Sequence, residues 1–309
     1  MNPDAPVTLL GLDWSEPDTP QLRITDPAEE AGSRLVSLLD EHTFHVQGEQ
    51  KHCAGWFDLT GPQAAHRVCE QSRTLERGRQ CRHCQYREGF LAAHQAHTDP
   101  AALPENIREY LQQPHWLYLD IFADGTTKVG TAAESRRRSR LAEQGPAAAV
   151  YVARTDDGIA VRALEAAVSE RFNLTQQVRS ARKVRALQNK VDPASLTEDL
   201  DALSARVCSY LADITADRSG TQVFCDPEAW VRPACADAVL EAAPVLAYPD
   251  QLTTGSHRIH IHGASGPVAL LSTDPTPDAA RYCADLSSLV GRRLHPASEA
   301  APTASPTLF

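Results

Sequence analysis

The stretch HWLYLDIFADGTTKVGT, residues 115–131, decides the fold. Its first part, residues 115–122, is rich in aromatic and branched residues and predicts a β-strand. The tetrad ADGT at residues 123–126 contains Asp-Gly, a dipeptide that favours a tight turn between antiparallel strands. Residues 127–131 predict the returning strand. The whole stretch is therefore typical of a β-hairpin, and the rest of the fold is built outward from it.

Helical and strand patterns alternate after this hairpin. Gly145-Pro146 ends the first helical stretch, and the second has Val161, Leu164 and Val168 at helical spacing. The expected elements are a helix, a strand and two further helices, at residues 133–144, 148–153, 159–172 and 175–190. We therefore expect an α+β fold with a small mixed or antiparallel sheet flanked by helices.

Composition divides the chain into five expected segments. They are a β-rich N-terminal region, a cysteine segment, the hairpin domain, a C-terminal region that is first helical and then β-rich, and a disordered tail rich in Pro, Ala, Ser and Thr. Their ranges are 1–50, 51–90, 115–190, 194–295 and 296–309. Outside the hairpin domain we expect helices at residues 104–113 and 194–214 and a second hairpin at 257–271.

The cysteine segment is rich in Cys, His and Arg and poor in aliphatic residues, so it cannot form an apolar core and needs another source of stability, such as a bound metal. Cys81 and Cys84 form a C-x-x-C pair, whose spacing allows both sulfurs to bind one ion. Together with Cys53 and Cys69 they make a soft set of four thiolates, which selects Zn²⁺ over Mg²⁺ or Ca²⁺. We expect a structural zinc site with these four cysteines as ligands.

Two alternatives to this zinc site remain open. A redox-active C-x-x-C would follow a thioredoxin-like apolar strand, and none precedes Cys81 in the sequence. Alternatively, His52, His66 or His83 replaces one of the cysteine ligands. The cysteines outside the segment are scattered and are expected to be buried as small hydrophobic residues: Cys208, Cys225, Cys235 and Cys283.

The charge distribution points to a polyanionic partner. The net charge is −10, but residues 118–190 contain 13 Lys or Arg and 8 Asp or Glu. A basic segment within an acidic chain focuses positive potential, so we expect DNA or RNA as the partner, held through its phosphates. The alternative is that these side chains only solvate helix faces. The nucleic-acid contacts are expected at Arg136, Arg137, Arg138, Arg179, Arg182, Lys183 and Arg185.

Four side chains of the hairpin domain suit phosphodiester chemistry. Tyr118 lies on the first strand, Lys128 on the second, Arg140 on the next helix and Glu165 on the helix after that. Arginine pairs a phosphate through two hydrogen bonds, and a carboxylate holds Mg²⁺ or Mn²⁺ together with waters. A phenol or a metal-bound water can then be positioned for in-line attack. The alternative for each residue is a structural role, such as a strand aromatic or an edge-strand charge.

These residues resemble a GIY-YIG-type nuclease domain, and more narrowly the bacterial family catalogued as domain of unknown function 2797. The pieces that carry the resemblance are QPHWLYL (Gln113–Leu119), KVGT (Lys128–Thr131), the R-x-x-x-Q-G of Arg140, Gln144 and Gly145, the Glu165 helix, the upstream cysteine cluster, and the C-terminal stretches Gly263–Leu271 and Leu289–Arg292. The resemblance implies a metal-dependent endonuclease with Tyr118, Arg140 and Glu165 as its catalytic set and Lys128 as a phosphate contact.

Two motifs depart from the GIY-YIG pattern. Residues 116–118 read WLY in place of Gly-Ile-Tyr, and residues 128–130 read KVG, without the second tyrosine. Lysine binds phosphate but is a poor general base unless it is desolvated. The alternative function is therefore a zinc-stabilised module that binds nucleic acid or protein without turnover.

Three histidines lie close together in the sequence near the C-terminal hairpin. His260 and His262 share a face if they lie on a strand, and with His257 we favour a polar strand face over a second metal site. The sequence has no run of about 18 apolar residues, so it predicts no membrane-spanning helix. The N-terminal residues do not resemble a secretory leader, so we expect a cytoplasmic protein without a membrane partner.

Overall fold

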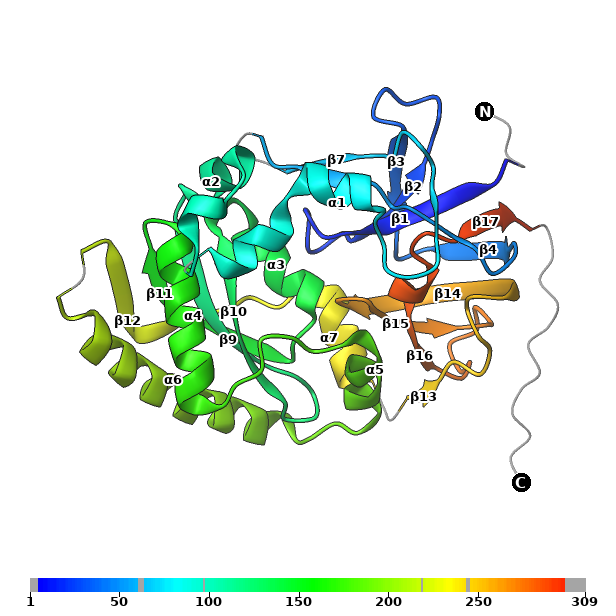
Figure 1. The fold of residues 1–309 in the computed structure, drawn as a ribbon. Helices are drawn as coiled ribbons and strands as arrows, with labels where there is room; N and C mark the ends of the chain where they lie inside the picture. The colour runs from blue at the N-terminus through cyan, green and yellow to red at the C-terminus, as the bar shows by residue number, and fades with distance from the viewer. Residues whose placement is uncertain (1–4, 61–63, 97, 218, 243–244, 298–309) are drawn as a thin grey trace. The chain divides into compact units, whose positions relative to one another are not determined.

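The computed structural model describes residues 5–60, 64–96, 98–217, 219–242 and 245–297 (Figure 1). Contacts separate two compact units, each assembled from distant stretches of the chain. Unit 1 comprises Met1–Phe57, His66–Arg87 and Pro233–Phe309, and unit 2 comprises Asp58–Ala65 and Glu88–Arg232. The boundaries of the five segments expected from the sequence remain predictions. The expected disordered tail lies outside the described residues from residue 298 onward.

Unit 1 is built on a nine-stranded sheet in the order β13-β16-β15-β14-β4-β17-β1-β2-β3. Neighbouring strands are antiparallel, except that β13 and β16 are parallel. The first and last strands of the chain are paired, with Val7 opposite Leu294. The strands are β1 Val7–Asp13, β2 Gln21–Thr25, β3 Ser33–Ser37, β4 Glu41–Val46, β13 Leu246–Ala247, β14 Gly255–Ser265, β15 Val268–Ser272, β16 Tyr282–Asp285 and β17 Arg293–Pro296.

The remaining elements of unit 1 are short. Helix α7, Ala234–Glu241, packs on β14, and a 3-10 turn covers Leu286–Leu289. The cysteine segment contributes the pairs β5–β8 and β6–β7 and helix α1. Their bounds are β5 Lys51–His52, β6 Trp56–Asp58, β7 Ala65–Arg67, β8 Thr74–Leu75 and α1 Arg82–Glu88. Strands this short bury little apolar surface, as the composition of the segment predicts.

Unit 2 contains the expected hairpin in a four-stranded antiparallel sheet, in the order β10-β9-β11-β12. In the hairpin, Tyr118 lies opposite Gly130 and Asp120 lies opposite Lys128. Every residue of β9 is buried, so this central strand is covered on both faces. The strands are β9 His115–Ile121, β10 Thr127–Ala133, β11 Ala148–Thr155 and β12 Thr221–Ala229.

Two helices of unit 2 begin at residues that suit a helix N-terminus. The carboxylate of Asp157 accepts hydrogen bonds from the backbone N–H groups of Ile159 and Ala160, both at 2.8 Å, and so caps α4. Pro193 opens α6 in the position where its missing N–H costs nothing. The helices are α2 Glu105–Leu111, α3 Arg137–Gln144, α4 Gly158–Phe172, α5 Ser180–Gln188 and α6 Pro193–Thr215, with 3-10 turns at Phe90–Gln95, Pro100–Ala102 and Glu134–Arg136.

Helices lie on both faces of this sheet. Leu141 of α3 packs with Trp116 and Tyr118 of β9 on one face. Successive strand side chains alternate between faces, so His115 points to the other side. A Cβ on Gly158, at the start of α4, would lie 2.9 Å from the His115 ring. Helix α4 therefore covers the face opposite α3, beside α6, which also contacts β9 and β11 (Figure 1).

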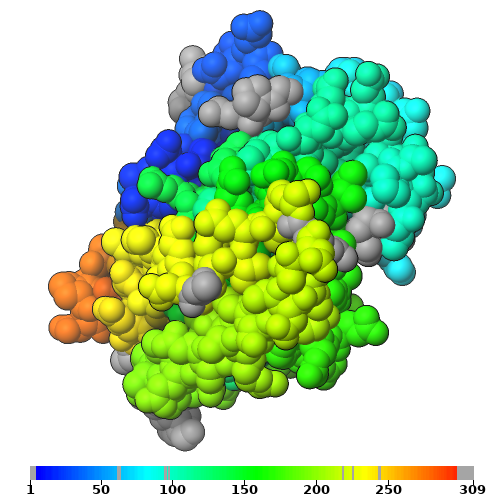
Figure 2. Space-filling view, turned by 90° about the vertical axis from the view of Figure 1, so that its left-hand side faces the viewer, coloured from blue at the N-terminus to red at the C-terminus, as the bar shows by residue number. Residues whose placement is uncertain are grey.

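Helix α6 is amphipathic, as its leucine spacing predicts. Leu196, Leu200, Val207 and Leu211 are buried against the unit, and Figure 2 shows the outer surface of this helix. None of the helices in the described ranges is long and apolar enough to cross a bilayer.

The α+β class and the order of elements in the hairpin domain are confirmed, with two local differences. The helix expected at 175–190 starts only at Ser180, because Thr175 pairs beside Lys128 and accepts a hydrogen bond from the Val129 N–H at 3.1 Å. Strand β12 extends the sheet beyond β11, although its sequence shows no clear alternation.

Candidate functional site

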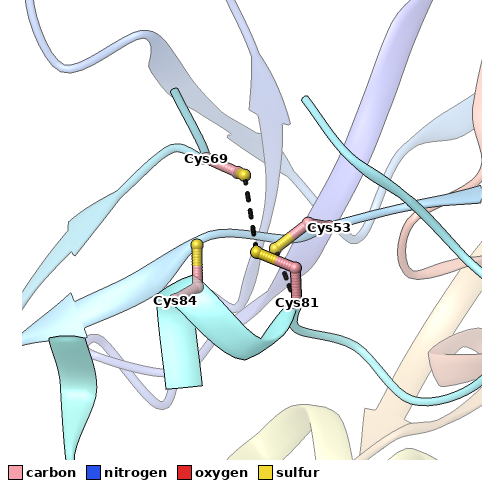
Figure 3. A group of neighbouring side chains, drawn as sticks. All are labelled: Cys53, Cys69, Cys81 and Cys84. Atoms are coloured by element: carbon pink, nitrogen blue, oxygen red, sulfur yellow. Dashed lines mark hydrogen bonds between the residues drawn. The ribbon is translucent and has the colours of Figure 1, made fainter. Parts of the chain in front are cut away.

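The four cysteines of the segment come from three separate stretches of chain. Cys53 follows β5 and Cys69 follows β7, while Cys81 precedes α1 and Cys84 lies in its first turn. Figure 3 shows their side chains converging from these stretches. All four are buried and carry free thiols.

A glycine explains how the widely spaced pair comes together. Gly55 has φ +87°, a left-handed conformation that side chains rarely adopt, and a Cβ there would overlap the carbonyl oxygen of Arg67. The absence of a side chain lets the strand after Cys53 lie directly against the backbone leading to Cys69. Cys53 and Cys69 stand 16 positions apart in the sequence, and this backbone contact, not a short loop, brings them together.

The sulfur geometry fits a tetrahedral metal ion. The four Sγ atoms all lie within 4.8 Å of one another, and those of Cys69 and Cys81 are 4.0 Å apart. Four thiolates placed about 2.3 Å from a tetrahedral Zn²⁺ would be separated by roughly 3.8 Å. The backbone N–H of Cys81 donates to the Cys53 sulfur at 3.1 Å, a contact that stabilises a thiolate. The residues present thus fit a metal ion with four sulfur ligands.

The thiols also resist ionising together unless a cation is present. Burial raises the pKa of Cys53, and burial with the neighbouring sulfurs raises the pKa of Cys84. Burial also opposes ionisation of Cys81, but the Cys84 N–H and the neighbouring sulfurs outweigh it and bring its pKa to about 7. A bound cation would stabilise all four thiolates, so metal binding would release protons.

The described structure favours neither alternative for this cluster. His66 is engaged with the Ala54 carbonyl oxygen at 2.7 Å, and His52 approaches the Ser72 carbonyl at 3.5 Å. Among the described residues, the only group of metal-ligating side chains close enough to share an ion contains the cysteines alone. Residues 76–80, directly before Cys81, form bends and not a strand, unlike the setting of a redox-active pair.

In unit 2, three predicted site residues come together with a fourth residue, Asp120, that sequence reasoning missed. The Lys128 ammonium donates to the Tyr118 hydroxyl at 3.0 Å and to the Asp120 carboxylate at 3.3 Å. All three side chains are at most 3% exposed. A Cβ on Gly130 would lie 2.5 Å from the Tyr118 hydroxyl oxygen, so glycine lets the phenol lie across β10. Asp120 could have been found from the hairpin register, because it lies directly opposite Lys128.

Arg140 adds a further cation to this buried group. Its guanidinium interacts with the Tyr118 hydroxyl and lies 3.6 Å from the Glu143 carboxylate. Burial raises the pKa of Asp120, and nearby Lys128 only partly offsets the effect. The pKa of Lys128 is raised because Asp120 and Tyr118 outweigh the effect of its burial. The group therefore holds its charges by mutual pairing inside the unit.

Glu165 does not join this group. It lies on α4 and forms an ion pair with Arg162 at 2.6 Å, with both side chains largely buried. Helix α4 covers the sheet face that carries His115, whereas Tyr118 points to the α3 face. Glu165 is buried on the same side of α4 as Val161 and Val168. Helical periodicity carries no information on which sheet face that helix covers.

The sequence profile of the family described as "Protein of unknown function (DUF2797)" matches residues 43–255. The chain belongs to this family. The match spans more than half of the chain and includes the four cysteines, the hairpin and α3. No curated protein and no solved structure matches the chain.

The predicted nucleic-acid contacts of this DUF2797 protein divide into internal and exposed cations. Arg137 lies between the rings of Trp116 and Tyr151, at 3.8 and 4.6 Å from their centroids. Arg136 pairs with Glu143, and Lys183 is buried with its ammonium 2.5 Å from the Gln144 carbonyl oxygen. These three cations support the fold.

The other four predicted contacts are exposed. We call them the arginine quartet: Arg138, Arg179, Arg182 and Arg185. Arg182 lies 3.6 Å from Asp124, and the Arg185 Nε donates to the carbonyl of Ala181 at 3.4 Å. Both contacts are on the surface and leave donors of each guanidinium available to a ligand.

The histidine group of the DUF2797 protein has separate local partners. His257 is buried between the Tyr248 hydroxyl at 3.1 Å and the Thr254 carbonyl at 2.8 Å. His260 lies 3.7 Å from Glu41, and His262 is hydrogen-bonded to the Ser272 hydroxyl at 2.8 Å. In the part of the chain that the structure describes, these rings do not gather around one point that an ion could occupy.

Proposed function

We propose that this DUF2797 protein binds nucleic acid through the arginine quartet of unit 2, without turnover, and that Zn²⁺ staples its cysteine segment. The observation that carries the binding is the exposure of these four guanidinium groups on the most basic part of an acidic chain. Exposed arginines pair with backbone phosphates and release counterions from them. This chemistry favours any nucleic acid over a particular base sequence.

The arrangement of the other predicted site residues supports binding over cleavage. Tyr118 and Lys128 are occupied by each other and by Asp120, away from solvent. A reacting phosphodiester must come within about 3 Å of both its nucleophile and its charge-stabilising groups. With Glu165 on the far face of the sheet, a metal held there would not reach the Tyr118 hydroxyl.

Zinc is the metal that this donor set favours. Four buried thiolates in a near-tetrahedral group select a soft or borderline ion, and such sites stabilise small segments that lack an apolar core. Free thiols also fit a reducing compartment, which supports a cytoplasmic location. Elemental analysis of the purified chain tests this part, with one zinc per chain as the expected result.

Binding is tested by titrating fluorescent DNA and RNA, single- and double-stranded, at several salt concentrations. The affinity should fall steeply with salt, and alanine at both Arg182 and Arg185 should reduce the salt slope by about two. The matched control replaces Arg171 and Arg206, which are exposed in the same unit but stack near Phe172. Equal weakening by the control pair, or no salt-dependent binding by the wild type, would discard the proposal.

A second candidate is a GIY-YIG-like phosphodiesterase, favoured by the gathering of Tyr118, Lys128 and Arg140. It predicts cleavage of a branched or single-stranded substrate with Mg²⁺ or Mn²⁺, lost in Glu165→Ala but kept in Glu170→Ala, an exposed position on the same helix. Any such product from the wild type would refute the absence of turnover. Cleavage retained by Glu165→Ala would remove Glu165 as the metal ligand.

A further inference from the structure

The outer face of α1 presents an aromatic ring to solvent. Tyr86 is 88% exposed, more than any other large hydrophobic residue in the described ranges. Arg82 lies one helical turn before it, and Arg73, Arg77 and Arg79 are exposed on the chain leading into the helix. We propose that Tyr86 and these arginines form a binding surface for single-stranded nucleic acid, in which the Tyr86 ring stacks on an unpaired base.

The cysteine cluster dictates the direction of Tyr86. Cys84 points inward to the other sulfurs, and its side chain is 1% exposed. Residues two positions apart on an α-helix point about 200° from each other. Tyr86 and Arg82 both stand two positions from Cys84, so both are directed outward and share one face. The same cysteine contacts that form the metal site thus hold the ring in solvent.

The charges around this ring favour an anionic partner. Residues 51–90 contain seven Lys or Arg and four Asp or Glu. Within the described residues, Arg77, Arg79 and Arg82 take part in no ion pair. Arg87 is different, because it pairs with Glu70 at 3.1 Å and lies 4.7 Å above the Trp56 ring. Arg87 is therefore already engaged by Glu70 and Trp56, while the other arginines remain available to phosphates.

An exposed ring among free arginines fits an unpaired strand better than a duplex. A base offers its face only when it is unstacked from its neighbours, and aromatic side chains then bind it without regard to sequence. Arginines beside the ring can follow the flanking phosphates. This inference goes beyond the proposed function of unit 2, because the surface lies in unit 1 and depends on stacking in addition to charge.

The test uses the full chain purified with its metal and labelled oligouridylate, oligodeoxythymidylate and a duplex as probes. Tyr86→Ala should raise the dissociation constant for the single strands by roughly 5- to 150-fold, the range for one lost base stack. Tyr86→Phe should stay within about twofold, since the ring face is kept. Val231→Ala is the control, because Val231 is an equally exposed hydrophobic residue (86%) in unit 2. This variant should bind the single strands as tightly as the wild type.

Separate outcomes decide the two proposals. Equal affinity of Tyr86→Ala and the wild type for single strands overturns the stacking surface, and so does loss of affinity in Tyr86→Phe as large as in Tyr86→Ala. Weakening by the arginine-quartet variants alone leaves the proposed function of unit 2 standing while this inference falls. Photo-crosslinking of an oligomer containing 5-iodouridine supplies an independent readout, with the crosslink expected at Tyr86 and a crosslink confined to unit 2 counting against it.

Discussion

The cysteine cluster of unit 1 and the Tyr118 group of unit 2 gather polar side chains in opposite ways. The cluster brings four like groups together, and each thiolate repels the others until a cation is bound. The Tyr118 group combines a phenol, two cations and a carboxylate that interact with one another, although the Oδ1 atom of Asp120 has no hydrogen-bond partner. The first arrangement gathers like groups and calls for a cation, whereas the second already pairs opposite charges within the chain.

The surroundings of the two groups explain this difference. In its described residues, the cysteine segment has only two-residue and three-residue strands and one short helix. The Tyr118 group lies on a sheet covered by helices on both faces, where apolar packing already holds the backbone. A polar cluster within a packed core must pair its own charges, whereas a cluster in a segment without an apolar core can stabilise that segment by binding a metal.

The largest expected effect is removal of the metal from the cysteine segment. Cys84→Ser or a strong chelator should abolish metal binding and leave the segment open to proteolysis, because structural zinc contributes about 10–16 kcal/mol of binding free energy in zinc-finger peptides. The metal-to-protein ratio and the cleavage pattern are the measurements. Cys208→Ser, in a buried cysteine outside the cluster, should keep the metal. Full metal content in Cys84→Ser would show that the cluster is not a four-ligand site.

A smaller loss is expected when the internal pairing of unit 2 is broken. Asp120→Ala leaves the Lys128 ammonium buried without its anion, which should cost about 3–5 kcal/mol in the free energy of unfolding. Urea denaturation measures the loss. The double variant Asp120→Leu with Lys128→Met should recover much of it, since no charge then remains buried. A double variant as unstable as Asp120→Ala would mean that the pair is not self-contained.

Gly55→Ala tests the close backbone approach that unites Cys53 and Cys69. A left-handed φ costs a side chain of order 1–3 kcal/mol, and the added Cβ must also displace the Arg67 carbonyl. Gly48→Ala is the matched control, because Gly48 has φ +68° and nothing within 4 Å of the added Cβ. We expect faster loss of metal to a competing chelator in Gly55→Ala than in Gly48→Ala. Equal rates would remove the backbone approach as the organising contact.

The smallest expected effect is a pH dependence centred on His66. Burial lowers the pKa of this imidazole from 6.5 to about 4. Between these values the unfolded chain binds a proton that the folded chain does not, so stability should fall as the pH falls through this window. His66→Gln, which can still donate to the Ala54 carbonyl, should flatten this part of the curve. Because the thiols also gain protons on acidification, the difference between the two proteins is the quantity to measure, and identical curves would contradict the assignment.

Local signals in the sequence predicted much of unit 2. The Asp-Gly turn located the hairpin, and helical spacing located α4 and α6. The C-x-x-C pair and the aliphatic-poor composition likewise identified the cysteine cluster, although the structural role of Gly55 depends on a contact 12 residues away that no local pattern reveals.

Features that depend on contacts between distant parts of the chain could not be predicted from the sequence. Strand β12 has mixed polarity because it is an edge strand with a bulge in its pairing to β11. The position of Glu165 depends on which face of the sheet α4 covers, and the covered face is a tertiary property. The pairing of Val7 with Leu294 joins residues almost a chain length apart, and neither strand carries a mark of its partner.

That terminal pairing has a consequence for biosynthesis. Strand β1 is synthesised long before its neighbour β17, because all the other strands lie between them in the chain. Residues 88–232 can fold in the meantime, since all four strands of their sheet lie within that interval. Until β17 has been made, the edge of β1 that pairs with it is open, and such edges invite association with other chains. The edge of β1 is therefore open to such association throughout the synthesis of unit 2.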